Sequence, residues 1–118
     1  MAATSKQTWH KIADSLAEIK FSVNGLAEIE INGKTICIAQ HKTQLFACTQ
    51  KCPHAGGILA DGYIDAVGNL VCPVHKYKFN ILNGRNVSGE GYYLKTFLIE
   101  QRENGVFICL EYSTLLDE

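Results

Sequence analysis

Four residues of this sequence have the types and the spacing of a set of metal ligands. Cys52 and His54 are separated by one residue, Cys72 and His75 by two residues, and seventeen residues lie between the two pairs. A cysteine binds a metal as a thiolate. A histidine binds through one ring nitrogen, which leaves the other nitrogen free to donate a hydrogen bond or to lose a proton. Thiolates combined with imidazoles suit either an iron–sulfur cluster or a zinc ion.

The order of the ligands along the chain separates these two alternatives. Common structural zinc sites pair their ligands as C-x₂₋₄-C and H-x₃₋₅-H, whereas each pair here contains one cysteine and one histidine. A proline follows each cysteine, at Pro53 and Pro73, and the chain has no other proline. Proline fixes its φ angle and helps to set a tight loop. The arrangement favours an iron–sulfur cluster and leaves a zinc-stabilised binding module without a redox role as the alternative.

The pattern C-x-H…C-x-x-H resembles the ligand pattern of a Rieske [2Fe–2S] centre, in which two cysteines hold one iron and two histidines hold the other. Over residues 9–112 the chain resembles the soluble Rieske-type ferredoxins of bacterial multicomponent oxygenases, and it is also similar to the small subunit of assimilatory nitrite reductases. The resemblance implies one [2Fe–2S] cluster per chain. It places Cys52 and Cys72 on the inner iron and His54 and His75 on the outer iron.

Several positions depart from related patterns. The Rieske proteins of cytochrome bc complexes carry an extra cysteine in each loop, whereas this chain has Gly57 and Val74 there. Those proteins also carry a serine and a tyrosine whose hydroxyls bond to sulfur; the matching residues here are Tyr77 and Phe79. Fewer hydrogen bonds to sulfur stabilise the reduced cluster less, so we predict a low reduction potential. The family usually has glycine after the second histidine, where this chain has Lys76.

The remaining cysteines and histidines have simpler interpretations. Cys37, Cys48 and Cys109 fall within apolar runs that read as strands. A buried free cysteine behaves as a small hydrophobic residue, which is the role we predict for all three. His10 and His41 lie in polar surroundings and are predicted to be at the surface.

Length and composition limit the class of protein. With 118 residues, of which 47% are hydrophobic, the chain is expected to form a single domain over residues 1–118 with an adequate core. A net charge of −1 gives no support to nucleic-acid binding. No apolar run has the length of a signal peptide or a membrane span, and five cysteines without a disulfide-like pattern suit a reducing compartment. We therefore expect a cytoplasmic protein that binds neither nucleic acid nor membrane.

Most of the chain is predicted to form short strands. Alternating apolar and polar residues indicate half-buried strands, and Asn32-Gly33 indicates a hairpin turn. Ser15 and Glu18 match a capping box, which predicts a short helical turn over residues 14–20. The predicted strands span residues 9–13, 27–31, 35–39, 45–49, 62–65, 70–71, 77–81, 93–100 and 106–112.

The predicted fold class is therefore all-β: a small antiparallel sandwich or barrel, of the Rieske type by resemblance. Two loops would form its cluster-binding subdomain, the first motif loop (residues 52–57) and the second motif loop (residues 72–79).

The resemblance implies a carrier of single electrons rather than an enzyme. The expected partners are an NAD(P)H-dependent flavin reductase as the donor and a terminal oxygenase as the acceptor. The alternative is the small subunit of an assimilatory nitrite reductase, whose partner would be the large subunit. Lys51, Lys76 and Lys78 make the surroundings of the motif loops basic, and we expect them to contribute to docking.

Overall fold

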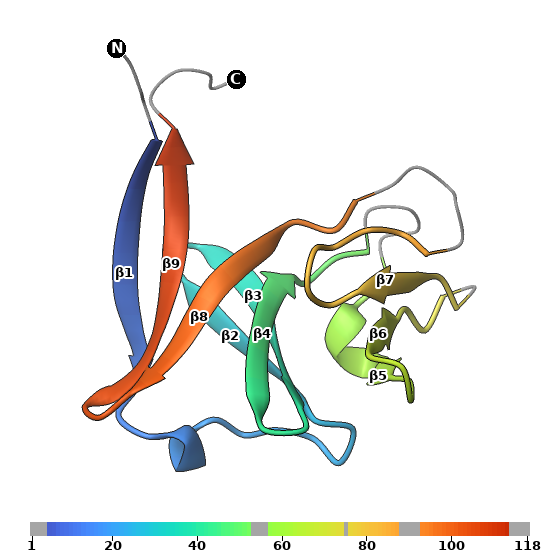
Figure 1. Ribbon diagram of the computed structural model, residues 1–118, viewed down its shortest axis with the longest axis horizontal. Helices are drawn as coiled ribbons and strands as arrows, with labels where there is room; N and C mark the ends of the chain where they lie inside the picture. The colour runs from blue at the N-terminus through green and yellow to red at the C-terminus, as the bar shows by residue number, and fades with distance from the viewer. Residues whose placement is uncertain (1–4, 53–56, 75, 88–92, 114–118) are drawn as a thin grey trace.

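The computed structural model describes residues 5–52, 57–74, 76–87 and 93–113, with side chains described between residues 8 and 110 of these ranges. Within the described residues, the strands form two antiparallel sheets (Figure 1). Helical structure there is limited to two short 3₁₀ turns, η1 (Leu16–Glu18) and η2 (Leu59–Asp61). The prediction of an all-β antiparallel fold is confirmed. No described helix is long and apolar enough to cross a membrane.

The larger sheet contains six strands in the order β1-β9-β8-β4-β3-β2, and Figure 1 shows it curving into half of a barrel. All its neighbouring strands pair in antiparallel fashion. The six strands are β1 (Ser5–Ala13), β2 (Leu26–Ile31), β3 (Lys34–His41), β4 (Gln44–Thr49), β8 (Thr96–Arg102) and β9 (Gly105–Ser113).

The β2–β3 hairpin illustrates how local sequence sets the larger sheet. Asn32 and Gly33 have φ angles of 51° and 77°, the pair of left-handed conformations that a type I′ turn requires. That turn matches the twist of the flanking strands and fixes their register, in which Ile29 lies opposite Ile36. The predicted turn is confirmed.

The smaller sheet consists of β5 (Tyr63–Ile64), β6 (Asn69–Val71) and β7 (Lys78–Asn80) in that order. It is inserted between β4 and β8, which are neighbours in the larger sheet. Cys48 of β4 pairs with Thr96 of β8, and the N–H of Thr49 donates to the carbonyl of Lys95 at 3.0 Å. Both ends of the insertion therefore leave the larger sheet at one point, and the two motif loops belong to this insertion (Figure 1).

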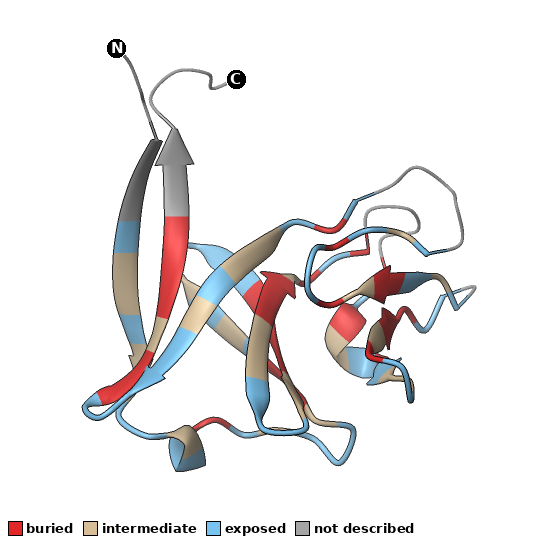
Figure 2. Cartoon of the chain, in the orientation of Figure 1, coloured by how far each residue is buried: buried red, intermediate tan, exposed pale blue. Residues whose placement is uncertain are grey.

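Two clusters of buried residues stabilise these parts, and Figure 2 shows buried segments in both. The first consists of residues of the larger sheet together with Ile19, which follows η1: Ile19, Ala27, Ile36, Ile38, Ala47, Val106, Ile108 and Leu110. The second joins the larger sheet to the insertion and consists of Leu26, Cys37, Ala39, Cys48, Cys52, Leu59, Leu70, Cys72, Phe79, Ile81 and Leu94.

The three cysteines outside the motif loops are buried, as predicted. Cys37 lies directly opposite Cys48 in the β3–β4 pair. A hydrogen bond between the two thiols, together with burial, raises the pKa of Cys48 well above its ordinary value. Cys109 is 3% exposed in β9.

Three local expectations are corrected. The helical turn is shorter than predicted, and the Ser15 side chain makes no capping bond. The Glu18 carboxylate accepts the N–H of Asp14, the residue before Ser15, at 2.7 Å. β8 begins at Thr96 rather than at residue 93, since residues 93–94 pair with the turn at residues 84–85.

The histidines outside the motif loops are less exposed than we predicted. His10 and His41 are both half-buried. The His41 ring lies beside the β5–β6 turn, where a Cβ atom added to Gly68 would be 3.7 Å from its Nε2. The insertion therefore covers part of this ring, which the sequence around His41 does not indicate.

Candidate iron–sulfur site

The first motif loop begins at Cys52, three residues after the end of β4, and short hydrogen bonds close its base. The N–H of Cys52 donates to the carbonyl of Gly57 at 2.8 Å, and Lys51 forms an antiparallel bridge with Ile58. On the far side of this bridge from the loop, the main-chain carbonyl of Gln50 accepts the N–H of Leu59 at 2.8 Å. These contacts hold Cys52 in the second buried cluster, with 2% of its surface exposed.

The second motif loop begins at the end of β6 and has a similar base. The N–H of Cys72 donates to the carbonyl of Tyr77 at 2.8 Å, and Cys72 is fully buried. The N–H of Val74 points at the sulfur of Cys72, with a distance of 3.4 Å between nitrogen and Sγ. A main-chain N–H near sulfur is what a tight loop around a cluster offers, because such bonds stabilise the additional negative charge of the reduced state.

The two motif loops meet at Gly57. A Cβ atom added there would lie 2.8 Å from Cγ2 of Val74 and 2.9 Å from Sγ of Cys72, so a side chain larger than hydrogen has no space. The thiols of Cys52 and Cys72 are close enough to form a hydrogen bond with each other. Burial raises the pKa of Cys72, the N–H of Val74 lowers it, and the neighbouring thiol of Cys52 raises it further.

The structure thus brings together the two cysteines that the sequence singles out. Two soft sulfur donors lie side by side in a buried setting with an N–H aimed at one of them, which fits a thiolate-held iron of a [2Fe–2S] cluster. His54 and His75 lie outside the described residues, and within the described part no three candidate metal ligands come together. The ligand set Cys52, His54, Cys72 and His75 therefore stays a prediction.

Comparison with known families decides the class. A sequence model described as the Rieske [2Fe-2S] domain matches residues 8–97, which is most of the chain and includes both motif loops. The chain belongs to the Rieske [2Fe–2S] domain family. Members of this family hold a Rieske-type [2Fe–2S] cluster, so the match favours iron and sulfide over the zinc alternative.

Two relatives match this chain over only part of their own length. The cholesterol 7-desaturase nvd of Bombyx mori is 26% identical over 107 residues, which cover 85% of this chain and 23% of that protein. The ferredoxin component of a naphthalene 1,2-dioxygenase/salicylate 5-hydroxylase system of Ralstonia sp. is 25% identical over 57 residues, which cover 48% of this chain and 54% of that protein. The chain therefore spans about a quarter of one relative and about half of the other.

Solved structures share the fold. The ferredoxin of carbazole 1,9a-dioxygenase from Nocardioides aromaticivorans has a TM-score of 0.72 at 16% identity and covers 86% of this chain and 96% of its own. A protein described as an NADH-dependent nitrite reductase small subunit from Mycobacterium tuberculosis has a TM-score of 0.76 at 12% identity and covers 89% and 96%. At these identities the comparison establishes the fold alone, that of a Rieske-type domain.

The departures noted in the sequence have a structural context in this Rieske domain. Gly57 and Val74, which replace the extra cysteines of cytochrome bc Rieske proteins, are in contact across the two loops. Lys76 has a φ angle of +56°, the left-handed conformation that glycine adopts without strain. The usual glycine after the second histidine is therefore explained by backbone conformation, and this chain accommodates a lysine there at an energetic cost.

Replacing Lys76 by glycine is expected to stabilise the protein by up to about 1 kcal/mol, because it removes the strain of an L-residue in the left-handed region. Urea titration of samples with equal cluster content would measure the change. Lys76→Ala is the matched control, since it removes the charge but keeps the Cβ atom that causes the strain. An equal gain in both variants would show that charge, not backbone strain, is responsible.

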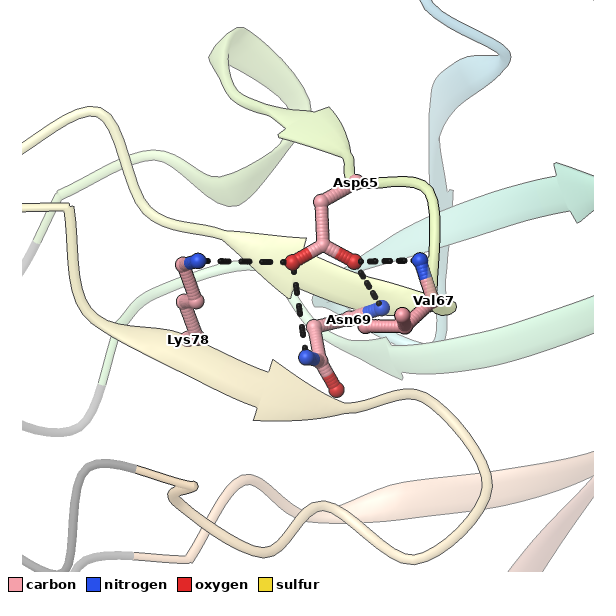
Figure 3. Close-up of polar contacts among 4 residues, drawn as sticks. All are labelled: Asp65, Val67, Asn69 and Lys78. Atoms are coloured by element: carbon pink, nitrogen blue, oxygen red, sulfur yellow. Dashed lines mark hydrogen bonds and ion pairs between the residues drawn. The ribbon is translucent and has the colours of Figure 1, made fainter.

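A carboxylate anchors the turn that precedes the second motif loop (Figure 3). Asp65 accepts the main-chain N–H groups of Asn69 at 2.9 Å and Val67 at 3.1 Å, and the Asn69 side-chain amide at 3.4 Å. Its other partner is the Nζ atom of Lys78 on β7, at 3.6 Å. These contacts, the N–H of Asn69 above all, hold the pKa of Asp65 below its ordinary value. Asp65 therefore links the β5–β6 turn to the strand that leaves the second motif loop.

The depressed pKa of Asp65 predicts how stability depends on pH. A carboxylate of this kind contributes stability that is fully present above its unfolded-state pKa of about 3.9 and is lost as the pH falls through its folded-state value. Asp65→Asn is expected to cost about 1 kcal/mol at neutral pH and to reduce the acid dependence of stability below pH about 4. Asp61→Asn, an exposed residue of η2, is the control. Urea unfolding midpoints measured across the acid range test this prediction. If the midpoints of Asp65→Asn and of wild-type protein decrease equally as the pH falls, the prediction is wrong.

Proposed function

We propose that this Rieske domain carries single electrons from an NAD(P)H-dependent flavin reductase to a terminal oxygenase, with Cys52, His54, Cys72 and His75 as the cluster ligands. Electron transfer is the activity that a Rieske ferredoxin-type domain supports. Bound at this site, a [2Fe–2S] cluster supplies one-electron chemistry. The chain's own part is to hold two buried sulfurs together and to direct the N–H of Val74 at the sulfur of Cys72.

The observation that carries the proposal is the convergence of Cys52 and Cys72 from two separate loops within a chain that matches the Rieske model. The oxygenase partnership is supported by the relative named as a ferredoxin component of a dioxygenase system and by the shared fold of the carbazole dioxygenase ferredoxin. The alternative, a nitrite reductase small subunit, is supported by the shared fold of the mycobacterial protein.

One experiment tests the carrier role and separates the two partnerships. Purified protein with full cluster content would be reduced by NADH through candidate flavin reductases and then mixed with either a candidate oxygenase or a sirohaem nitrite reductase. We expect the visible and EPR signals of the cluster to cycle once per electron delivered to an oxygenase. Reoxidation by the nitrite reductase alone would favour the alternative, and a cluster that neither partner reoxidises would contradict the carrier role.

The second motif loop also predicts the reduction potential. Phe79 is completely buried and its side chain has no donor to offer sulfur, so we expect a potential near the lower end of the Rieske range, about −150 mV. Phe79→Tyr should raise the potential if its hydroxyl reaches the sulfur of Cys72. Phe46→Tyr, on β4, is the control and should leave it unchanged. EPR-monitored redox titration measures both, and a wild-type potential well above zero would contradict the prediction.

A further inference from the structure

A cavity of about 490 Å³ opens where the larger sheet meets the base of the first motif loop. Three lysines from separate segments line it. Lys34 begins β3, Lys51 directly precedes the first motif loop, and Lys95 lies directly before β8. The tertiary structure therefore gathers positive charge from positions sixty-one residues apart in sequence onto one site. We call this site the lysine groove.

The charge of the lysine groove is largely uncompensated. None of the three lysines forms an ion pair with another described residue, whereas Lys78 pairs with Asp65 at 3.6 Å. Glu28 is the single acidic residue in the wall, so the lining side chains have an excess of two positive charges. The chain as a whole has a net charge of −1, so this local excess is opposite in sign to the whole molecule.

The groove also has an apolar part. Ile36, Ile58 and Phe97 also line it, and Ile58 is 37% exposed. The Nζ atom of Lys95 lies 5.7 Å from the centre of the Phe97 ring, which keeps this ammonium group beside the apolar surface. Apolar surface within a charged rim is typical of a protein docking site, where the charges select the partner and the apolar contact adds affinity.

The groove shares its wall with the candidate iron–sulfur site. Lys51 and Ile58 form the bridge that closes the base of the first motif loop, and Cys52 follows Lys51 directly. A partner held in the groove would therefore lie against the loop that carries one of the proposed cluster ligands. Electron carriers gain from such placement, because attraction between opposite charges accelerates encounter and fixes orientation.

We propose that the lysine groove docks a carboxylate-rich segment of a redox partner, with an apolar side chain of that segment between the lysines. This inference rests on the proposed function and specifies the partner's surface: acidic, with an apolar residue among the acids.

The test uses the cluster-containing protein and a fluorescently labelled, capped hexapeptide of two leucines flanked by four glutamates. Fluorescence anisotropy at low ionic strength should detect binding that weakens as salt is added. The triple variant Lys34→Gln, Lys51→Gln and Lys95→Gln should weaken binding about tenfold, since exposed charge pairs each contribute a small factor. The control variant Lys11→Gln, Lys20→Gln and Lys42→Gln changes the net charge equally but away from the groove, and it should bind as wild type does.

Three results would overturn the inference: no binding to wild-type protein, equal weakening in both triple variants, or displacement of the peptide by inorganic phosphate at the peptide's own concentration. The last result would show that the groove binds small anions rather than a polypeptide. Iron content and the EPR signal, measured on the same samples, report the proposed function separately. Absent peptide binding in protein with a full cluster therefore rejects the groove and leaves the carrier role intact.

Discussion

Replacing Cys72 by serine is expected to abolish the cluster. Serine has nearly the same size but offers a hydroxyl that remains protonated at neutral pH, whereas iron in these clusters is held by thiolate. Iron and acid-labile sulfide should fall from two of each per chain, the composition of one [2Fe–2S] cluster, to background, and the EPR signal of the reduced protein should disappear. The same result is expected for Cys52→Ser and for replacement of His54 or His75 by alanine.

The matched control for this prediction is Cys48→Ala. Cys48 is a buried cysteine of the same core cluster as Cys52 and Cys72, but its thiol forms a hydrogen bond with the thiol of Cys37 across the β3–β4 pair. The Cys48→Ala variant should retain full iron and sulfide, although removal of the buried sulfur atom lowers its free energy of unfolding. Wild-type protein that contains stoichiometric zinc and no labile sulfide, after expression with ample iron, would contradict the cluster assignment itself.

The second large effect is expected at Gly84, which lies in the turn after β7. A Cβ atom added there would lie 1.8 Å from the carbonyl oxygen of Leu94, and the residue has a φ angle of +76°. The N–H of Leu94 donates to the carbonyl of Gly84 at 2.7 Å, so the two backbones are held in contact and cannot separate without breaking that bond. Gly84→Ala is expected to cost about 4 kcal/mol, combining left-handed strain with a backbone clash.

Gly33→Ala provides a control of the same conformational type. Gly33 has a φ angle of +77°, but a Cβ atom added there would meet nothing within 4 Å. Gly33→Ala should lower the free energy of unfolding by about 1 kcal/mol, which is the effect of the left-handed backbone strain alone. The difference between the two variants in urea unfolding therefore measures the clash. Equal costs at Gly84 and Gly33 would show that the chain near Leu94 can move aside, contrary to the close packing described above.

The clash at Gly84 is also expected to affect the candidate iron–sulfur site. Leu94 belongs to the core cluster that contains Cys52 and Cys72, and it lies two residues before the start of β8. A clash at this contact should therefore loosen the insertion as well as the turn. We expect Gly84→Ala protein to lose its cluster faster than Gly33→Ala protein when both are incubated with a chelator.

The amino-acid sequence alone determined those features that depend on residues adjacent in the chain. The type I′ turn at Asn32-Gly33 was predictable because two adjacent residues both tolerate positive φ, and the β2–β3 register follows from that turn. The candidate ligands could be singled out from the sequence because thiolate and imidazole have specific metal chemistry whatever surrounds them, and the ligand set itself stays a prediction. The burial of Cys37, Cys48 and Cys109 followed from the apolar runs that contain them.

Only the tertiary structure decided the features that depend on distant segments. The pairing of β4 with β8 makes the smaller sheet and the two motif loops an insertion with both ends at one point, although forty-six residues separate the two strands in sequence. The contact of Gly57 with Val74, the lysine groove and the partial burial of His41 each bring together segments that are distant in sequence. The physical reason is that strand order and the meeting of loops are set by packing of the whole core, whereas a turn or a ligand type is set by a few residues.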